Sequence, residues 1–446
     1  MPHNTLQRKL GLFQATVLNM IDMVGIGPFV TLPIVIGLLG GMYIYAWIAG
    51  AILSLIDALI WSELGAAYPQ AGGSYNFLKH AYKKQGLGKL MSFLYVWQTV
   101  IQAPLVAASA AIGFAHYFGY LMPLQVWQTK ALSGLVIVIV TVLLYRKIDN
   151  VGKLGILLWV GVILTLGWII VSALLYGDVT KSIGSMSTFN WNTIASFAFG
   201  QACVKTIYSY LGYYNVCHLG GEIKQPQRNI PRSMFISVIG IAILYLAMNV
   251  SITSVVPWQS IQADYIAEKD TFIISTFFEN LYGIKVAKVA TVMVLWVALA
   301  SLFAVMLGYS RVPYAAAVDG AFFKVFAKLH PTKHFPYISL LILAGIAFVF
   351  SLLFKMKDVI SGILAMRILV QFIGQAIGVL LLSKNEGRKH LPFKMPLYPL
   401  PILLAIILWS FVFYATGTTG IISFSIVFGS GLLFYFINNR LTKKMF

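Results

Sequence analysis

The sequence predicts an all-α integral membrane protein with about 12 transmembrane helices. Two observations carry this prediction: 59% of the 446 residues are hydrophobic while only 10% are charged, and the mean hydropathy is +0.84. A soluble domain could not cover so much apolar area with so few charged residues. No stretch of the chain is polar enough to form a separate soluble domain, so we expect one polytopic domain over 1–446.

Apolar runs of roughly 20 residues or more, separated by short loops, mark the expected membrane-spanning helices. Two of the loops, 68–87 and 319–334, are expected to form amphipathic surface helices. A third, 222–232, is charged, is bracketed by prolines and is expected to be a solvated loop. The expected spans are 11–38, 43–67, 88–119, 127–145, 152–176, 190–218, 233–256, 271–309, 336–354, 359–383, 396–415 and 419–438.

The basic residues predict the orientation of the chain. Of the 32 Lys and Arg residues, 23 lie in the loops on the side of the two termini and 7 lie on the other side. Cytoplasmic loops of membrane proteins carry an excess of Lys and Arg. We therefore expect a multi-pass protein of the cell (plasma or inner) membrane, in contact with the lipid bilayer and with both termini in the cytoplasm.

Other features exclude several classes of function. The formal net charge of +19 does not indicate a nucleic-acid partner, because the basic residues lie beside the spans and leave no basic domain. Cys203 and Cys217 fall inside apolar segments and predict neither a disulfide nor a metal site. The chain contains no P-loop, HExxH or G-x-S-x-G motif. We therefore expect no enzymatic activity, no cofactor and no step driven by ATP.

The first span carries residues that disfavour a continuous helix. Gly25, Gly27 and Pro28 follow one another closely, and Pro33 lies about a turn later. A proline inside a helix costs about 3 kcal/mol, and glycines free the backbone to leave helical geometry. Unpaired backbone groups in hydrocarbon survive only where they line a cavity, and the N-terminus of a half-helix attracts a carboxylate. The alternative interpretation is a simple proline kink packed against a neighbouring helix.

The sixth span contains a second interruption. In 208–215 the apolar run gives way to hydroxylated and small residues at mid-depth. Matching interruptions in corresponding spans of two repeats indicate a binding site near the middle of the membrane. The alternative is an aromatic helix face that packs against other spans.

Five ionisable side chains lie at apparent membrane depth, where each is costly and therefore a candidate for function. They are Asp22, Asp57, Glu63, Lys205 and Arg367. Asp22 lies about one turn before the first interruption and Lys205 about one turn before the second, so either is a candidate for coupling to a proton or a sodium ion. For Glu63 a structural role is expected, and for Arg367 a scaffold contact with a carboxylate or with carbonyl groups.

Four segments together resemble the amino acid–polyamine–organocation superfamily. They match its glycine-rich motif in span 1, its span 2 and first-loop signature, its Glu-x-x-x-Pro loop and its Ser-Arg loop. The matching residues are 25–31, 62–65 with Pro69, Gly72, Gly73 and Tyr75, 221–231, and 310–320. The resemblance implies the leucine-transporter-type fold, in which two five-span repeats are inverted relative to each other and spans 1 and 6 are discontinuous. The repeats would cover 11–176 and 190–383, and 396–438 would form two additional spans.

The resemblance also implies a function and a site. The chain would be a secondary active transporter, a permease or exchanger, that moves a small amino acid by alternating access. Gly25, Ile26 and Gly27 would offer backbone N–H groups to the substrate carboxylate. The backbone carbonyls of 208–210 would accept hydrogen bonds from the substrate amino group, and the aromatic ring of Tyr208 would close over the substrate. The residues that would bind substrate are Gly25, Ile26, Gly27, Tyr208, Ser209, Tyr210 and Gly212.

Departures from the family pattern and other functions leave alternatives open. Pro28 stands where an aliphatic residue is usual, Ile26 replaces a small residue, and Leu211 stands beside Gly212 where a second glycine is common. A carrier of polyamines or other organic amines is the alternative within transporters, and a receptor or subunit without transport activity is a further one.

Overall fold

The computed structural model describes residues 6–186, 189–269, 271–354, 356–389 and 391–444, and every named element in them is a helix. A 3-10 turn, Gly40–Met42, separates the second and third α-helices. The α-helices of the first part of the chain are α1 (Leu12–Met23), α2 (Gly27–Leu39), α3 (Tyr43–Ala67), α4 (Ser74–Ala81), α5 (Gly88–Leu121), α6 (Val126–Leu144) and α7 (Ile148–Tyr176).

The second part of the chain has shorter helices between its long ones. It also contains 3-10 turns at Gly220–Glu222 and Lys324–Ala327 and a π-helical segment at Ile368–Ile373. Its α-helices are α8 (Val179–Ser185), α9 (Trp191–Ile194), α10 (Phe197–Tyr210), α11 (Asn215–His218), α12 (Pro226–Thr253), α13 (Trp258–Ile266), α14 (Ile273–Tyr282), α15 (Ile284–Tyr309), α16 (Arg311–Val318), α17 (Tyr337–Leu353), α18 (Met356–Arg367), α19 (Gly374–Glu386), α20 (Leu400–Ala415) and α21 (Gly417–Lys444).

Eight helical segments within the described residues are long and apolar enough to cross a membrane. Two shorter apolar helices, Tyr337–Leu353 and Leu400–Ala415, accompany them. The eight segments are Gly27–Ala67, Gly88–Leu121, Val126–Leu144, Ile148–Tyr176, Pro226–Thr253, Ile284–Val318, Gly362–Glu386 and Gly417–Ile437. The all-α membrane class is thereby confirmed, and the count of twelve crossings stays a prediction.

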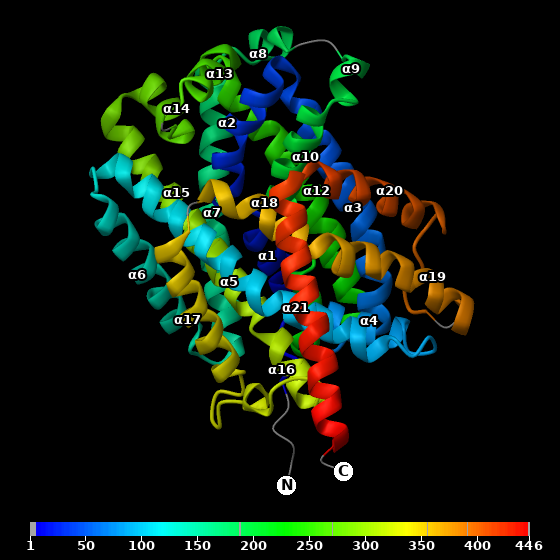
Figure 1. Ribbon diagram of the computed structural model, residues 1–446. Helices are drawn as coiled ribbons and strands as arrows, with labels where there is room; N and C mark the ends of the chain where they lie inside the picture. The colour runs from blue at the N-terminus through cyan, green and yellow to red at the C-terminus, as the bar shows by residue number, and fades with distance from the viewer. Residues whose placement is uncertain (1–5, 187–188, 270, 355, 390, 445–446) are drawn as a thin grey trace.

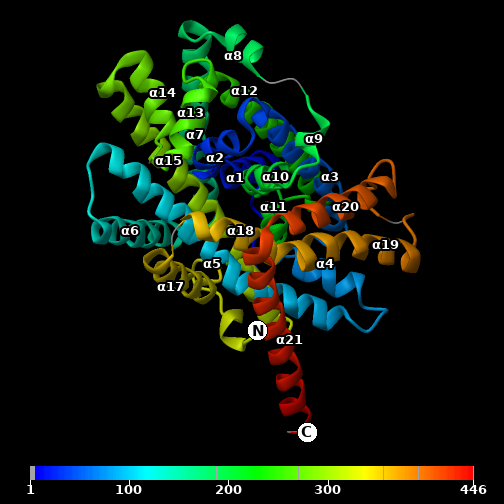
Figure 2. The same ribbon diagram turned by 45° about the horizontal axis from the view of Figure 1, so that its top comes forward.

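The interrupted helices lie in the middle of the bundle. Figure 2 shows α1, α10 and α11 at its centre, with α3, α5, α7 and α12 around them. The helix α12 packs against α1 and α3, and α15 packs against α1, α5 and α7. The C-terminal end of α21 lies on the lower side of Figure 1, with α4 and α16, whereas α8, α9, α13 and α14 lie on the opposite side. The backbone interruptions are therefore enclosed by other helices rather than placed on the outer surface.

One predicted span is two helices in the structure. The run 271–309 was expected to form a single membrane-spanning helix, but α14 ends at Tyr282 and α15 begins at Ile284. Gly283 between them has a φ of +81°, a conformation that glycine adopts without a steric penalty. The chain turns there, and α14 packs against α15. Hydropathy alone does not reveal this turn, because both helices are apolar.

The loop predictions need two corrections and one adjustment. The segment 319–334 does not form an amphipathic surface helix, because Gly320 at φ +71° follows the end of α16 and only Lys324–Ala327 is helical afterwards, as a 3-10 turn. The segment 222–232 is not a solvated loop, since Glu222 is fully buried and α12 already begins at Pro226. The helix expected in 68–87 covers only α4.

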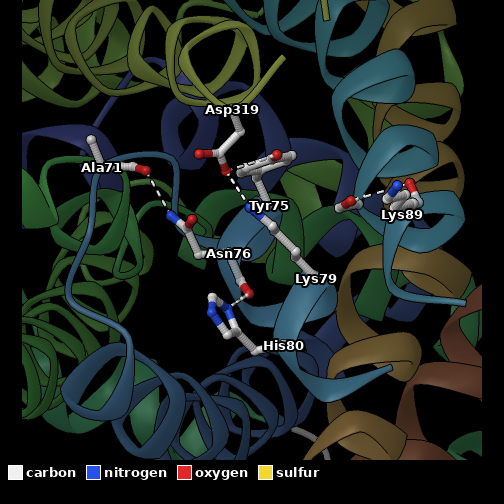
Figure 3. A network of polar contacts seen from close by, with 8 residues as sticks. Ala71, Tyr75, Asn76, Lys79, His80, Lys89 and Asp319 are labelled. Carbon is white, nitrogen blue, oxygen red and sulfur yellow. Dashed lines mark hydrogen bonds and ion pairs between the residues drawn. The ribbon is translucent and has the colours of Figure 1, made fainter. Parts of the chain in front are cut away.

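A polar network fastens α4 to the end of α16 (Figure 3). The Lys79 Nζ lies 2.6 Å and the Tyr75 hydroxyl 3.0 Å from Asp319 Oδ2. The Asn76 side chain donates to the Ala71 carbonyl oxygen at 2.7 Å and closes the turn before α4. Burial, with the Asp319 carboxylate beside it, raises the pKa of Tyr75, so its phenol stays protonated and donates. The network joins residues 240 positions apart in the chain.

Candidate functional site

The first interruption lies between α1 and α2. The helix α1 ends at Met23, and α2 begins at Gly27 with Pro28 as its second residue. The first turn of any helix leaves backbone N–H groups without helical partners, and they point out of its N-terminus. Pro28 carries no N–H, so it removes one donor from this turn. The Gly25 N–H donates to the Met23 carbonyl oxygen at 3.1 Å across the gap between the two half-helices.

The second interruption follows α10 and touches the first one. Leu211 leaves helical geometry with ψ 148°, and Gly212 has a φ of +124°. A Cβ atom on Gly212 would lie 2.7 Å from the Met23 backbone nitrogen and 2.8 Å from the Asp22 carbonyl carbon. Only a glycine therefore fits where the two breaks meet. This close approach favours paired interruptions over a simple proline kink in the first span and an aromatic packing face in the sixth.

Side chains from neighbouring helices hold the two interruptions together. The Tyr245 hydroxyl from α12 lies 2.7 Å from the Met23 carbonyl oxygen and 3.2 Å from the Ser209 carbonyl oxygen. It therefore donates to carbonyl groups at the C-terminal ends of both α1 and α10. The hydroxyl groups of Thr31 on α2 and Ser209 on α10 share a hydrogen bond of 2.9 Å. Freed backbone groups in a membrane protein need such partners.

A small cavity of about 50 Å³ lies at the point where the interruptions meet. Most of the predicted substrate-binding residues line it: Gly25, Ile26, Gly27, Tyr208, Ser209 and Gly212. Of the two coupling candidates, Asp22 lines the cavity and Lys205 does not.

Tyr210 is the predicted binding residue that does not line the cavity. Its ring packs against Trp47, with ring centroids 6.0 Å apart, and against Tyr245, with centroids 5.2 Å apart. The reason is helical geometry, because a residue two positions after Tyr208 points to the opposite side of α10. Tyr208 faces the first break instead, since a Cβ atom on Gly27 would lie 3.4 Å from its ring.

Sequence reasoning missed several residues that line the cavity. The polar ones are Ser301, Tyr309, Tyr214 and Arg367, and the apolar ones include Val106, Ala110, Val305 and Ile363. Arg367 had a visible signal, because it is an ionisable residue at apparent membrane depth. The predicted scaffold contact was wrong in its partner: within the described residues Arg367 Nη1 donates to the Tyr214 hydroxyl and not to a carboxylate or a carbonyl group. For Ser301 no sequence signal existed inside its apolar run.

Other buried charges have close partners away from the cavity. The Asp57 carboxylate accepts hydrogen bonds from the Tyr213 hydroxyl at 2.5 Å and from Trp409 Nε1 at 3.2 Å. Glu63 Oε2 accepts from Arg388 Nη2 at 2.5 Å and from the Met395 backbone N–H at 2.7 Å. These contacts tie α3 to distant parts of the chain, which agrees with the structural role expected for Glu63.

The sequence is similar to a known family of membrane proteins and to several of its members. Residues 10–437 match the sequence profile of a family described as amino acid permease. The chain is 28% identical to the serine/threonine exchanger SteT of Bacillus subtilis, over 97% of each chain. It is 22% identical to the branched-chain amino acid permease BcaP of the same species, over 99% of this chain and 95% of that one. A methylthioribose transporter of that species is 24% identical to this chain, over 98% of this chain and 94% of that one. With its all-helical fold and its profile match over nearly the whole length, the chain belongs to the amino acid permease family.

Proposed function

We propose that this permease is a secondary active transporter that carries or exchanges a small amino acid by alternating access. The observation that carries the proposal is the cavity at the meeting point of the two helix interruptions, lined by residues of both. Discontinuous helices with half-helix ends at a central cavity are a common way for transporters to bind charged solutes.

The backbone of the cavity suits the two charges of an amino acid. The substrate carboxylate would accept hydrogen bonds from the N–H groups at the N-terminus of α2, near Gly25 and Gly27, where the helix dipole favours an anion. The substrate ammonium group would donate to carbonyl groups at the C-terminal end of α10, at Tyr208 and Ser209. The Asp22 carboxyl group, which also lines the cavity, would accept a hydrogen bond from that ammonium group.

The same residues bear on alternating access and on ion coupling. In our proposal the inverted repeats cover 11–176 and 190–383, and the Tyr208 ring closes over the bound substrate. Asp22 is the better candidate for coupling to a proton or a sodium ion, because it lines the cavity whereas Lys205 does not. The excess of basic residues on the side of the termini supports a cell-membrane orientation with both termini in the cytoplasm.

A carrier of polyamines or other organic amines is the second candidate, and Asp22 is the observation that favours it. The guanidinium of Arg367 opposes it, since it lines the same cavity and repels a dication. The names of the relatives also favour an amino acid, although the methylthioribose transporter shows that relatives of this chain carry other solutes.

Counterflow in proteoliposomes tests the proposal. Vesicles that contain the purified protein are loaded with one unlabelled amino acid or with spermidine, and entry of the labelled compound is measured against vesicles without protein. We expect accumulation of at least one labelled amino acid and none of spermidine. Accumulation of spermidine alone would establish the amine carrier. Absence of any counterflow over the whole panel would favour a receptor or subunit without transport activity, because only a carrier exchanges solute.

A further inference from the structure

We infer that Arg367 selects an acidic amino acid, aspartate or glutamate, by binding the carboxylate of the substrate side chain. This inference rests on the proposed function and deepens it by naming the substrate class. It follows from three observations: where the guanidinium lies, how few partners it has, and which other charge faces the same cavity.

Arg367 is the last residue of α18, directly before the π-helical segment Ile368–Ile373. It is only 2% exposed and lines the cavity. Helix α18 packs against α5 and α10, so Arg367 enters the cavity from a different helix than the two interruptions do. π-Helical segments inside α-helices often occur at functional sites.

The Arg367 guanidinium makes few hydrogen bonds within the described residues. Its Nη1 donates to the Tyr214 hydroxyl, while its Nε is buried and has no hydrogen-bond partner among the described residues. A guanidinium carries five N–H donors in a planar fork that fits a carboxylate with two parallel hydrogen bonds. Its carbon Cζ lies 5.4 Å from the centre of the Tyr309 ring and 6.0 Å from that of Tyr214. The rings fix the orientation of the cation but neutralise none of its charge.

The second charge at the cavity does not neutralise Arg367 directly. Asp22 is near enough to interact with it electrostatically, yet the two side chains form no direct ion pair in the part of the chain that the structure describes. The cavity thus presents a carboxylate and a guanidinium separately. A ligand that carries a positive and a negative group can pair with both at once.

The charges of the site can then be matched to those of the substrate. The N-terminus of α2 binds the α-carboxylate, and Asp22 with the carbonyl groups at the end of α10 binds the ammonium group. Arg367 is left, and a neutral side chain would leave this buried charge without an anion, which is costly. A cationic side chain would be repelled. A side-chain carboxylate supplies the missing partner, so the site favours aspartate and glutamate over asparagine and glutamine of nearly the same shape.

Substrate pairs of equal shape and one matched variant provide the test. Counterflow of labelled glutamate, glutamine, aspartate and asparagine is measured for the wild-type protein, for Arg367→Gln, for Arg367→Lys and for Arg146→Gln. Arg146 is an exposed arginine between α6 and α7 and serves as the matched control. Each variant is first checked by size-exclusion chromatography and by thermal unfolding in detergent.

We expect the wild-type protein to prefer each acidic substrate over its amide by about tenfold or more in kcat/KM, as a buried charge-assisted pair implies. Arg367→Gln should remove that preference mainly through KM for the acidic substrates while exchange of the amides persists. Arg367→Lys should keep part of the preference, and Arg146→Gln should keep all of it.

Two results would overturn the inference and leave the proposed function standing. One is a wild-type protein that exchanges neutral amino acids but not acidic ones. The other is a folded Arg367→Gln protein that loses acidic and neutral substrates to the same degree. If Arg367→Gln does not fold, competition between glutamate and glutamine in the wild-type protein decides the question in the same way. If no amino acid is exchanged at all, the proposed function fails and this inference fails with it.

Discussion

Removing the charge of Glu222 should destabilise the protein far more than breaking an ion pair on its surface. Arg311 Nε lies 3.0 Å from Glu222 Oε2, and Arg311 Nη2 lies 2.9 Å from Glu222 Oε1, which makes a two-point contact. The side chains are 3% exposed for Arg311 and 0% for Glu222. The Glu222 carbonyl oxygen also accepts the backbone N–H groups of Lys9 and Leu10. One residue thus joins the segment before α1, the turn after α11 and the start of α16.

The size of the expected loss in unfolding free energy follows from the burial of the ion pair. Breaking a buried ion pair by removing one partner costs about 3–5 kcal/mol, because the other charge stays uncompensated. Glu222→Gln keeps the shape and one acceptor oxygen for Arg311, so we expect a loss near the lower limit, about 3 kcal/mol. Asp264→Asn is the matched control, since it breaks an ion pair with Lys269 whose side chains are 43% and 66% exposed. Exposed pairs are worth about 0–1 kcal/mol.

The assay is unfolding in mixed detergent micelles by titration with SDS, followed by tryptophan fluorescence. The double variant Glu222→Gln/Arg311→Met completes a cycle, and we expect a coupling free energy of at least about 1.5 kcal/mol between the two sites. The reasoning would be refuted if Glu222→Gln and Asp264→Asn lowered the free energy of unfolding equally. Additivity in the double variant would contradict it as well.

Three further outcomes follow from local geometry. Gly25→Ala places a Cβ atom 2.5 Å from the Ser301 Oγ, so we expect loss of counterflow in a folded protein, with partial recovery when Ser301→Gly is added. Cys203 and Cys217 are both buried and should not react with a maleimide reagent in the native protein but should both react in SDS, as mass spectrometry would show. Asp319→Asn removes a partly exposed pair, so its loss of stability should stay below about 1 kcal/mol and should shrink in high salt in a thermal-unfolding assay.

Much of the fold could be predicted from the sequence because bilayer thickness sets the length of each apolar run. The break between α1 and α2 falls on the glycines and proline that disfavour a helix there, and the end of α10 falls inside 208–215. The turn at Gly283 could not be predicted, since two apolar helices joined by one glycine have the same hydropathy as one long span. Short elements such as α8 and α13 also carry no strong hydropathy signal.

The residues that line the cavity were predicted best where backbone conformation requires a particular residue type. Gly25, Gly27 and Gly212 were found because breaking a helix requires particular residue types. Tyr210 does not line the cavity, because membership of an interrupted segment does not tell which way a side chain points, and the role expected for its backbone carbonyl stays a prediction. Ser301 was missed for the related reason that one small polar residue in an apolar run resembles ordinary helix packing. Side-chain direction and contacts between distant helices need the structure.

Buried charged residues of the scaffold differ from those at the cavity in whether another residue of the protein neutralises them. Glu222 has Arg311, Glu63 has Arg388, and the Asp57 carboxylate accepts two hydrogen bonds, so for all three the cost of burial is offset within the protein. Arg367 differs, since it lines the central cavity and has no direct carboxylate partner among the described residues. A charge that is costly to bury persists either because the fold neutralises it or because a ligand does. The first condition accounts for the scaffold contacts, and we propose the second for Arg367.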